Sequence, residues 1–202
     1  MMKAALSFSG GKDSSFALHK LQEEGVEVAC LITTIWRESG ETVAHGEKEE
    51  KIEKQASELG IPLEYIVTDF EGYTDDFKKR LMEIKGTYGI HAIGFGDIYL
   101  EGHREWGEDV AEAANLAALY PLWTKEENAA KVLRDYVAAG FKSKIIKVDE
   151  AKLPGSWIGR EIDADFISDV LKYNVCPLGE AGEYHSYVYD GPIFQKGKKS
   201  QS

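Results

Sequence analysis

The segment KAALSFSGGKDSS, residues 3–15, joins a short apolar run to a glycine-rich turn. Residues 3–8 are typical of a buried strand, and residues 14–24 carry their apolar side chains on one helical face. The paired glycines let the backbone approach a ligand closely, and a helix start offers free N–H groups and a positive dipole. With the charge of Lys12 and the serine hydroxyls, this segment predicts a phosphate site. An ordinary turn capped by Ser or Asp is the alternative.

Two common nucleotide motifs do not fit this part of the chain. A Walker A loop requires glycine where Leu6 stands and Ser or Thr where Asp13 stands. A Rossmann fingerprint requires a third glycine after Gly94 and Gly96, at the position of Tyr99. The phosphate site is therefore expected to belong to another class.

Apolar and helical segments alternate through the first 120 residues. This alternation predicts a parallel sheet covered on both faces by helices. The expected strands are residues 3–8, 26–36, 63–68 and 90–95, and the expected helices are residues 14–24, 47–59, 73–88 and 104–116.

The pattern becomes less regular after residue 119, which predicts a second, smaller α+β domain whose strands could pair antiparallel. We expect a first, phosphate-binding domain over residues 1–120, a substrate-recognition domain over 121–195 and a flexible tail over 196–202. The expected elements of the second domain are an extended piece at 120–123, helices at 126–138 and 164–173, and strands at 141–148 and 183–189.

Composition excludes several classes of protein. The 202 residues are 43% hydrophobic and 29% charged, with no apolar run long enough to span a membrane and no secretory leader pattern. The net charge of −11 disfavours nucleic-acid binding, which depends on neutralising phosphates. Cys30 and Cys176 lie far apart and outside any zinc motif, which predicts reduced thiols in a cytoplasmic protein.

Two further segments carry candidate site residues. Asp97 follows the fourth expected strand, where it could hold Mg²⁺, orient a nucleotide or cap a turn. Arg104 could clamp a phosphate or carboxylate, or simply pair with Glu101, and His103 is expected at the surface. Glycines surround carboxylates in GEAGEYH, residues 179–185, which indicates close approach to a ligand, with an acidic turn as the alternative.

These motifs together resemble a known family. SGGKDS, residues 9–14, looks like the PP-loop of the N-type ATP pyrophosphatases. Within that superfamily the chain resembles the diphthine–ammonia ligases. The resemblance rests on GFGDI (94–98), PLW (121–123), GEAGEYH (179–185) and DGPIF (190–194). It implies a parallel-sheet domain of the adenine nucleotide alpha hydrolase type followed by the smaller α+β domain.

The resemblance also implies an activity. Such enzymes cleave ATP between its α- and β-phosphates with Mg²⁺, adenylate a carboxylate and transfer ammonia to it, which releases AMP and pyrophosphate. The implied substrate is diphthine on elongation factor 2, whose trimethylammonium group suits carboxylates and aromatic rings. His185 stands where the family often has Glu, so a related substrate is also compatible.

The resemblance implies three sets of site residues. The catalytic set is Lys12, Asp13, Asp97 and Arg104, with Asp97 as the metal ligand. The ATP-binding set is Ser9, Gly10, Gly11, Lys12, Asp13, Ser14, Ser15, Thr33, Thr34, His45, Gly94, Phe95 and Gly96. The substrate-binding set is Glu101, Arg104, Glu180, Gly182, Glu183, Tyr184 and His185.

Two other functions remain as alternatives. A PP-loop enzyme of tRNA thiolation generally uses catalytic cysteines and a basic surface, and the cysteine positions and net charge disfavour it. A non-catalytic adenine-nucleotide sensor would use the same loop without turnover. A homodimer is an open alternative for the assembly.

Overall fold

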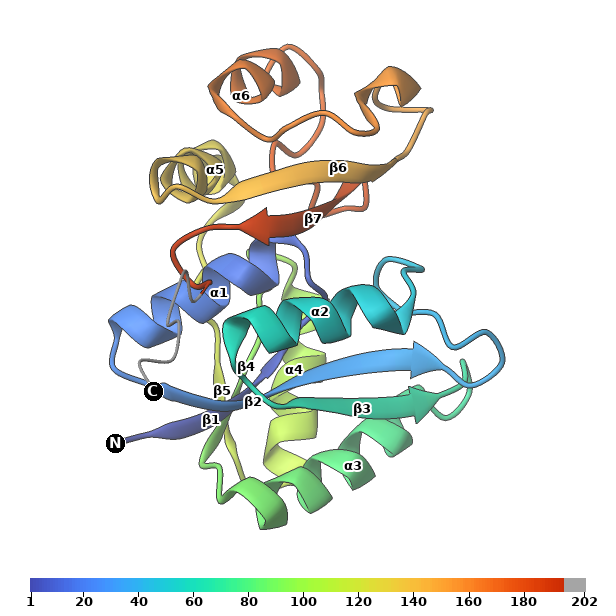
Figure 1. Cartoon of the computed structure of the whole chain (residues 1–202), viewed down its shortest axis with the longest axis vertical. Coiled ribbons are helices and arrows are strands. Elements are labelled where there is room, and N and C mark those ends of the chain that lie inside the picture. Colours follow the sequence, from blue (N-terminus) through green and yellow to red (C-terminus); the bar gives the residue numbers. More distant parts are fainter. Residues whose placement is uncertain (195–202) are drawn as a thin grey trace, which may run out of the picture.

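The computed structural model describes residues 1–194, so the predicted flexible tail at 196–202 lies outside the described residues. Five parallel strands form the central sheet in the order β3-β2-β1-β4-β5 (Figure 1). The strands are β1 (Lys3–Ser7), β2 (Glu27–Trp36), β3 (Leu63–Thr68), β4 (Ala92–Gly94) and β5 (Ala117–Leu119). The predicted parallel α/β architecture is therefore confirmed.

Alternating side chains of the two central strands build a core on each face of the sheet. Leu6 and Leu31 face one pair of helices, while Ala5, Cys30 and Ile32 face the other pair. All five are essentially inaccessible to solvent. This two-sided burial is why these strands are continuous apolar runs without a polar face.

Helices cover both faces of this sheet, as Figure 1 shows. Helices α1 (Lys12–Glu23) and α2 (Glu49–Leu59) lie on one face, and α3 (Tyr73–Tyr88) and α4 (Glu101–Ala113) lie on the other. Gly60 and Gly89 end α2 and α3 in the left-handed conformation, which glycine adopts without strain.

Two sequence-based boundaries need correction. The fourth helix begins at Glu101 rather than 104 and ends before Asn115, which adopts a positive φ of 51°. Residues 120–123, predicted as an extended piece, form a turn, and the extended segment is the three-residue strand β5 just before them, which ends at Leu119. A three-residue strand carries too little periodicity to be recognised from sequence.

The second half of the chain adds a two-stranded antiparallel sheet. It consists of β6 (Lys142–Val148) and β7 (Tyr184–Asp190), which confirms the antiparallel alternative. Figure 1 shows this sheet lying over α1 and α2, with α6 above it and α5 beside one end of β6. The helical elements of this half are η1 (Glu126–Asn128), α5 (Ala129–Ala138), η2 (Gly155–Trp157) and α6 (Ala164–Val170).

Aromatic packing joins the second sheet to the first helix. The ring of Phe16 on α1 meets Tyr136 and Phe141 edge-on, with centroids 5.8 and 6.0 Å apart. Phe16 belongs to the same buried cluster as Tyr184 and Val188 of β7. Because apolar burial and edge-on ring pairs stabilise such contacts, the two sheets share one core through α1.

The sheet order places the loops that follow β1 and β4 beside each other at the carboxyl end of the strands. Strand β1 lies between β2 and β4, so the loops that leave β1 and β4 diverge at the carboxyl end of the sheet. Ligands of open α/β sheets bind in such a crevice. In residues 1–194, no helix is both long enough and apolar enough to cross a membrane.

Candidate functional site

The glycine-rich turn at residues 9–11 connects β1 to the first turn of α1. Gly10 has a φ of +78°, which a residue with a side chain rarely adopts. The Ser14 hydroxyl lies 3.2 Å from both the backbone nitrogen and the hydroxyl of Ser9, which closes the turn. Helix α1 begins at Lys12 with no side-chain cap, so its positive end faces the space beyond the loop.

That space is a cavity of about 280 Å³, and most of the residues that line it are polar. The loop contributes one wall, and the segment before β7 contributes the opposite wall. The lining residues that the sequence predicted for this site are Ser9, Gly11, Lys12, Asp13, Ser14, His45, Gly96, Asp97, Glu180, Gly182, Tyr184 and His185. The fold thus brings together the loop and the GEAGEYH segment, which lie far apart in the sequence.

Lys12 makes its contacts within the protein. Its ammonium donates to the carboxylate oxygens of Asp13 at 2.8 and 3.0 Å and to the carbonyl oxygen of Leu178. It also lies 5.0 Å from the centre of the Tyr184 ring. Burial raises the pKa of Asp13 although Lys12 opposes that shift. Lys12 therefore joins the loop to the segment that precedes β7, and its predicted role toward phosphate stays a prediction.

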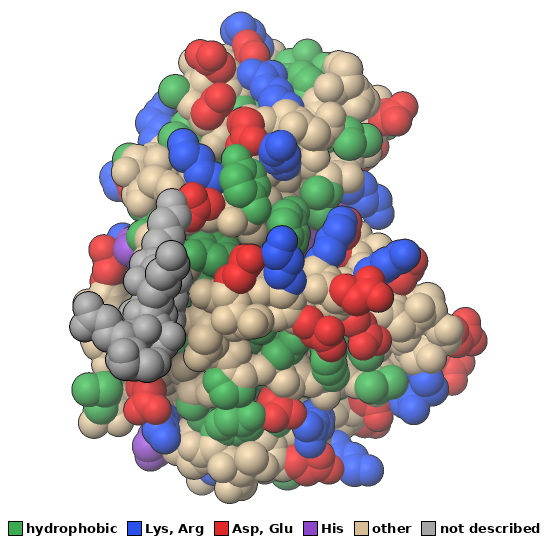
Figure 2. Space-filling view, in the orientation of Figure 1, with side chains coloured by type: hydrophobic (Ala, Val, Ile, Leu, Met, Phe, Trp, Pro, Cys, Tyr) green, Lys and Arg blue, Asp and Glu red, His purple; other side chains and the backbone are tan. Residues whose placement is uncertain are grey.

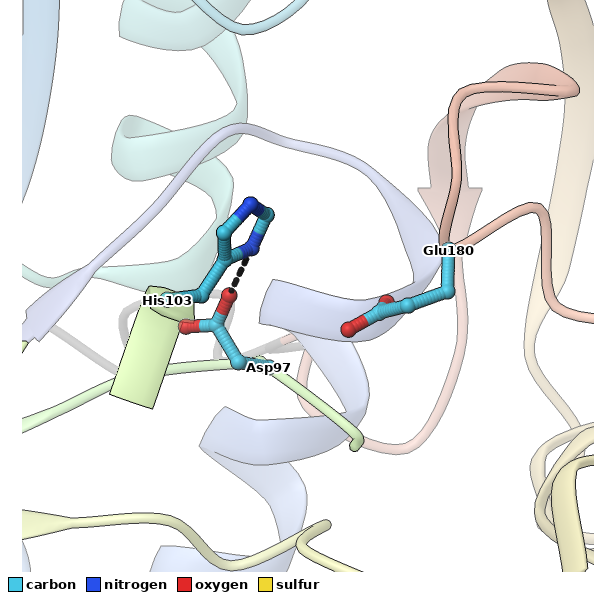
Figure 3. A group of neighbouring side chains, drawn as sticks. All are labelled: Asp97, His103 and Glu180. Atoms are coloured by element: carbon cyan, nitrogen blue, oxygen red, sulfur yellow. Dashed lines mark hydrogen bonds and ion pairs between the residues drawn. The ribbon is translucent and has the colours of Figure 1, made fainter. Parts of the chain in front are cut away.

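Three side chains that could hold a metal ion meet in the cavity, as Figure 3 shows. Asp97 and His103 come from the β4–α4 connection and α4, and Glu180 points toward them from the loop before β7. One ligand atom of each lies within 4.8 Å of the others, and His103 Nδ1 is 3.0 Å from Asp97 Oδ1. The carboxylate oxygens of Asp97 and Glu180 fit Mg²⁺, whereas an imidazole nitrogen suits transition metals better.

Electrostatics of this cluster favour a cationic neighbour. Burial is the main cause that raises the pKa of Glu180 to about 7, and the charges of Asp13 and Asp97 add to it. The backbone N–H of Ile98 donates to Glu180 Oε1 at 2.9 Å and fixes the position of the side chain. A hydrogen bond to Asp97 raises the pKa of His103. A ligand cation would offset this accumulation of negative charge.

A pair of histidines closes another side of the cavity. His45 Nδ1 lies 2.9 Å from His185 Nδ1, so one ring donates to the other. Burial lowers the pKa of His45 to about 3, with smaller contributions from His185, Lys12 and Lys147. Burial also lowers the pKa of His185. Both rings are therefore mostly neutral at pH 7, and the hydrogen bond requires that the accepting Nδ1 carry no proton.

A second, aromatic cavity adjoins the first. It encloses about 760 Å³, and the two cavities share Ser7, Ala44, Asp97 and His103. Aromatic side chains dominate its walls. They are Trp36, Phe70, Tyr73, Phe95 and Trp106. Phe70 is 88% exposed, which is unusual for an aromatic side chain and leaves a flat apolar surface open at the rim.

Several predicted site residues lie outside the polar cavity. Thr33 is buried, and its hydroxyl donates to the Phe8 carbonyl at 2.6 Å. Phe95 lines the aromatic cavity, and a side chain at Gly94 would meet Leu21. The others that do not line the polar cavity are Gly10, Ser15, Thr34, Glu101, Arg104 and Glu183.

Arg104 and Glu183 have structural contacts that the sequence did not indicate. Arg104 pairs with Glu108 at 2.8 Å rather than with Glu101, and its guanidinium lies 5.0 Å from the Trp123 ring. Glu183 is buried and accepts from the backbone nitrogens of Ala181 and Cys176, at 3.0 and 3.3 Å. Glu183 thus holds the loop that carries Glu180.

Sequence reasoning missed other residues of the site. His103 was expected at the surface; it is exposed but lines the polar cavity. Ser186 on β7 accepts a hydrogen bond from the Lys12 backbone nitrogen at 3.0 Å. Gln55 is fully buried beside Gly10. A polar residue on the apolar face of the predicted second helix was the available signal for Gln55.

Comparison with known proteins identifies two matching family models. Residues 2–118 match the family model of the diphthamide synthase N-terminal domain, and residues 128–201 match that of the C-terminal domain. The diphthine–ammonia ligases of Mus musculus and Homo sapiens are 29% and 26% identical to this chain. Both alignments cover 96% of this chain and 81% of the relative.

A solved structure is also similar. It is described as a predicted subunit of tRNA methyltransferase from Methanocaldococcus jannaschii, with 20% identity and a TM-score of 0.49. The match covers 95% of this chain and 100% of that one. Family membership rests on the two family models, which together span nearly the whole sequence. The chain therefore belongs to the diphthamide synthase family of enzymes.

Proposed function

We propose that this protein is an ATP-dependent ligase of diphthamide synthesis that converts a carboxylate of diphthine on elongation factor 2 into an amide. The observation that carries the proposal is the polar cavity that the glycine-rich loop and the GEAGEYH segment both line. One wall offers backbone N–H groups and a helix N-terminus, which suit phosphate. The other wall offers Glu180, beside Asp97 and His103.

In this proposal the two cavities bind different parts of ATP. The triphosphate would lie against residues 9–14, where the loop and the start of α1 stabilise negative charge. The flat base would enter the adjoining aromatic cavity, whose rings can stack on it. Asp97, which lines both cavities, would hold Mg²⁺, and the ion would offset the charge of the phosphates.

The reaction then has two steps. A carboxylate oxygen of the substrate attacks the α-phosphorus of ATP, and pyrophosphate leaves with the electron pair of the broken bond. Ammonia attacks the acyl carbon of the adenylate, AMP leaves, and one ammonia proton passes to solvent. The protein contributes by holding the carboxylate in line with the α-phosphorus, and Glu180 in the same cavity would face the trimethylammonium group beside that carboxylate.

The burial of Cys30 and the surface charges do not support the alternative of a thiolation enzyme. Cys30 is fully buried within β2, and burial raises the pKa of its thiol to about 12. On the face shown in Figure 2, Lys and Arg side chains are scattered among acidic ones rather than gathered into a basic surface. A nucleotide sensor remains distinguishable by the absence of turnover.

The experiment that tests the proposal measures products. Purified protein with ATP, Mg²⁺, ammonium and diphthine-bearing elongation factor 2 should release AMP and pyrophosphate, and mass spectrometry should show amide formation. Release of ADP and phosphate as sole products would contradict the mechanism. ATP binding without AMP release on this substrate would favour the sensor.

A matched pair of variants tests the placement of the substrate. Glu180→Gln should retain ATP binding and stability but lose AMP release by on the order of a hundredfold, because the substrate is no longer aligned. Glu183→Gln should instead lower the melting temperature, since Glu183 holds its own loop. Normal AMP release from Glu180→Gln would remove this residue from the site.

A further inference from the structure

Helix α2 buries one amide side chain on its otherwise apolar inner face. Gln55 is inaccessible to solvent, and Ile52, Ala56 and Leu59 are the other buried residues of the helix. Its Nε2 donates to the carbonyl oxygens of Gly10 at 2.9 Å and of Val188 at 2.6 Å. Two carbonyl acceptors around one end of the amide fix its orientation, because the oxygen end could accept from neither. Gln55 thus connects the glycine-rich loop to β7.

Strand β7 also contacts the loop directly. The Val188 backbone nitrogen donates to the same Gly10 carbonyl at 3.1 Å. The Ser186 hydroxyl accepts from the Lys12 backbone nitrogen at 3.0 Å and is itself buried. The loop is therefore bonded to two residues of β7 and to Gln55. Ser186 also lines the polar cavity, whereas Gln55 and Val188 do not.

We infer that β7 is the outer support of the phosphate-binding loop and that Gln55 is the positioning residue that ties the two together. Gln55 does not line the polar cavity, so it acts through Gly10 rather than on a ligand. The inference rests on the proposed binding of ATP at residues 9–14. A loop whose N–H groups are held in place before the nucleotide arrives loses less freedom on binding, and this raises affinity.

Gln55→Met is the principal test, because Met has a similar length and apolar bulk but donates no hydrogen bond. Gly10 keeps its bond from Val188, so the fold is expected to survive while the loop loses one restraint. ATP should bind on the order of tenfold more weakly, which corresponds to about 1.4 kcal/mol. In the AMP-release assay KM for ATP should rise while kcat stays nearly unchanged, a split that general destabilisation would not produce.

Two further variants make the test independent of the fate of Gln55→Met. Ser186→Ala removes the acceptor of the Lys12 nitrogen and should also weaken ATP binding. Ser143→Ala is the matched control, because Ser143 is a buried β6 serine bonded to Tyr136 at 2.8 Å and is not bonded to the loop. It should lower stability with no change in ATP affinity.

The outcomes separate this inference from the proposed function. Failure of the wild-type protein to bind ATP overturns the proposed function and the inference with it. Wild-type binding that Gln55→Met and Ser186→Ala leave unchanged overturns the inference alone. Equal losses of affinity in Ser143→Ala and Ser186→Ala would also overturn it, because the effect would then follow stability. If Gln55→Met does not fold, Gln55→Leu, which also lacks the donor, is measured in its place, because Ser186 lines the cavity and cannot decide the question alone.

Discussion

Lys12 is a buried cation whose contacts all lie within the protein. Its ammonium contacts Asp13, Leu178 and Tyr184 and is only 4% exposed. A buried cation of this kind compensates a carboxylate that would otherwise be unpaired near Asp97. Removing one member of such a pair is strongly destabilising, whereas removing both can be tolerated.

The Lys12 contacts predict a non-additive pair of variants. Lys12→Met should lower the free energy of unfolding by about 3 kcal/mol, because Asp13 is left partly buried without its cation. The double variant Lys12→Met/Asp13→Asn should be more stable than Lys12→Met alone. Urea unfolding at pH 7 measures both values, and a double variant less stable than the single would contradict this account.

The paired histidines predict a dependence of stability on pH. The pKa of His45 is about 3 in the folded protein and about 6.5 in an unfolded chain, so the unfolded state binds more protons between these values. His45 therefore makes stability fall as pH drops from about 6.5 toward 3, by up to about 1.4 kcal/mol per pH unit.

His45→Asn is the variant that isolates this effect, since an amide can replace the Nδ1 hydrogen bond but does not titrate. Urea unfolding of the wild type and the variant at pH 7 and pH 5 gives the comparison. The stability advantage of the wild type should shrink at pH 5. An advantage that is equal at both pH values would show that His45 is not held neutral.

Site residues that lie within short local motifs could be predicted from the sequence. Asp13, Ser14, Asp97 and Glu180 could be named because glycines and strand ends surround them. His103 and Ser186 could not be, because each enters the cavity only through tertiary contacts. Arg104 was proposed from its charge and from the family resemblance. It pairs with Glu108 on its own helix, and its role toward a ligand stays a prediction.

At the scale of elements, the turn between β1 and α1 depends on one backbone conformation. Gly10 and Gly25 have nearly the same φ, +78° and +77°. A methyl group at Gly10 would collide with the Gln55 side chain, whereas at Gly25 it would meet nothing within 4 Å. The two positions therefore separate backbone strain from steric conflict.

This comparison predicts different costs for the same substitution. Gly25→Ala should lower the free energy of unfolding by about 1 kcal/mol, the strain of a left-handed residue with a side chain. Gly10→Ala should lower it by about 2 kcal/mol or more and also abolish the ATP-induced rise in melting temperature. Thermal unfolding with and without ATP measures both. Equal effects of the two substitutions would contradict a special role for this turn.

Elements with strong periodicity were predictable, and short ones were not. The apolar runs that form β1, β2 and β3 and the apolar face of α3 indicated their own structure. Strand β5 has three residues and owes its conformation to its pairing with β4. Helix α4 begins one turn before its predicted start, since Glu101 and Gly102 carry no apolar signal.

At the scale of the whole molecule, the second sheet packs on the helices of the first, and the loop bonds to β7. That packing could not be predicted, because no local pattern states which surface a two-stranded sheet will cover. The predicted boundary near residue 120 stays a prediction. The shared core around Phe16 and Tyr184 indicates that the two sheets are coupled in stability.

Native-state hydrogen exchange tests this coupling. The amides of Val188 on β7 and Leu6 on β1 should exchange with opening free energies within about 1 kcal/mol of each other, as members of one cooperative unit. Amides at the exposed end of α6 serve as an internal reference for local opening. A β7 that exchanges far faster than β1 would show that the second sheet unfolds alone.

The bond between the Lys12 nitrogen and Ser186 spans 174 positions of the chain. A ribosome adds about 5–20 residues per second, so roughly 10–35 s separate the appearance of these two partners. The five parallel strands can assemble within that interval, but the loop then still lacks its outer support. A nascent chain would thus complete its largest sheet before the loop gains this support, and we expect ATP to stabilise that early sheet less than it stabilises the finished protein.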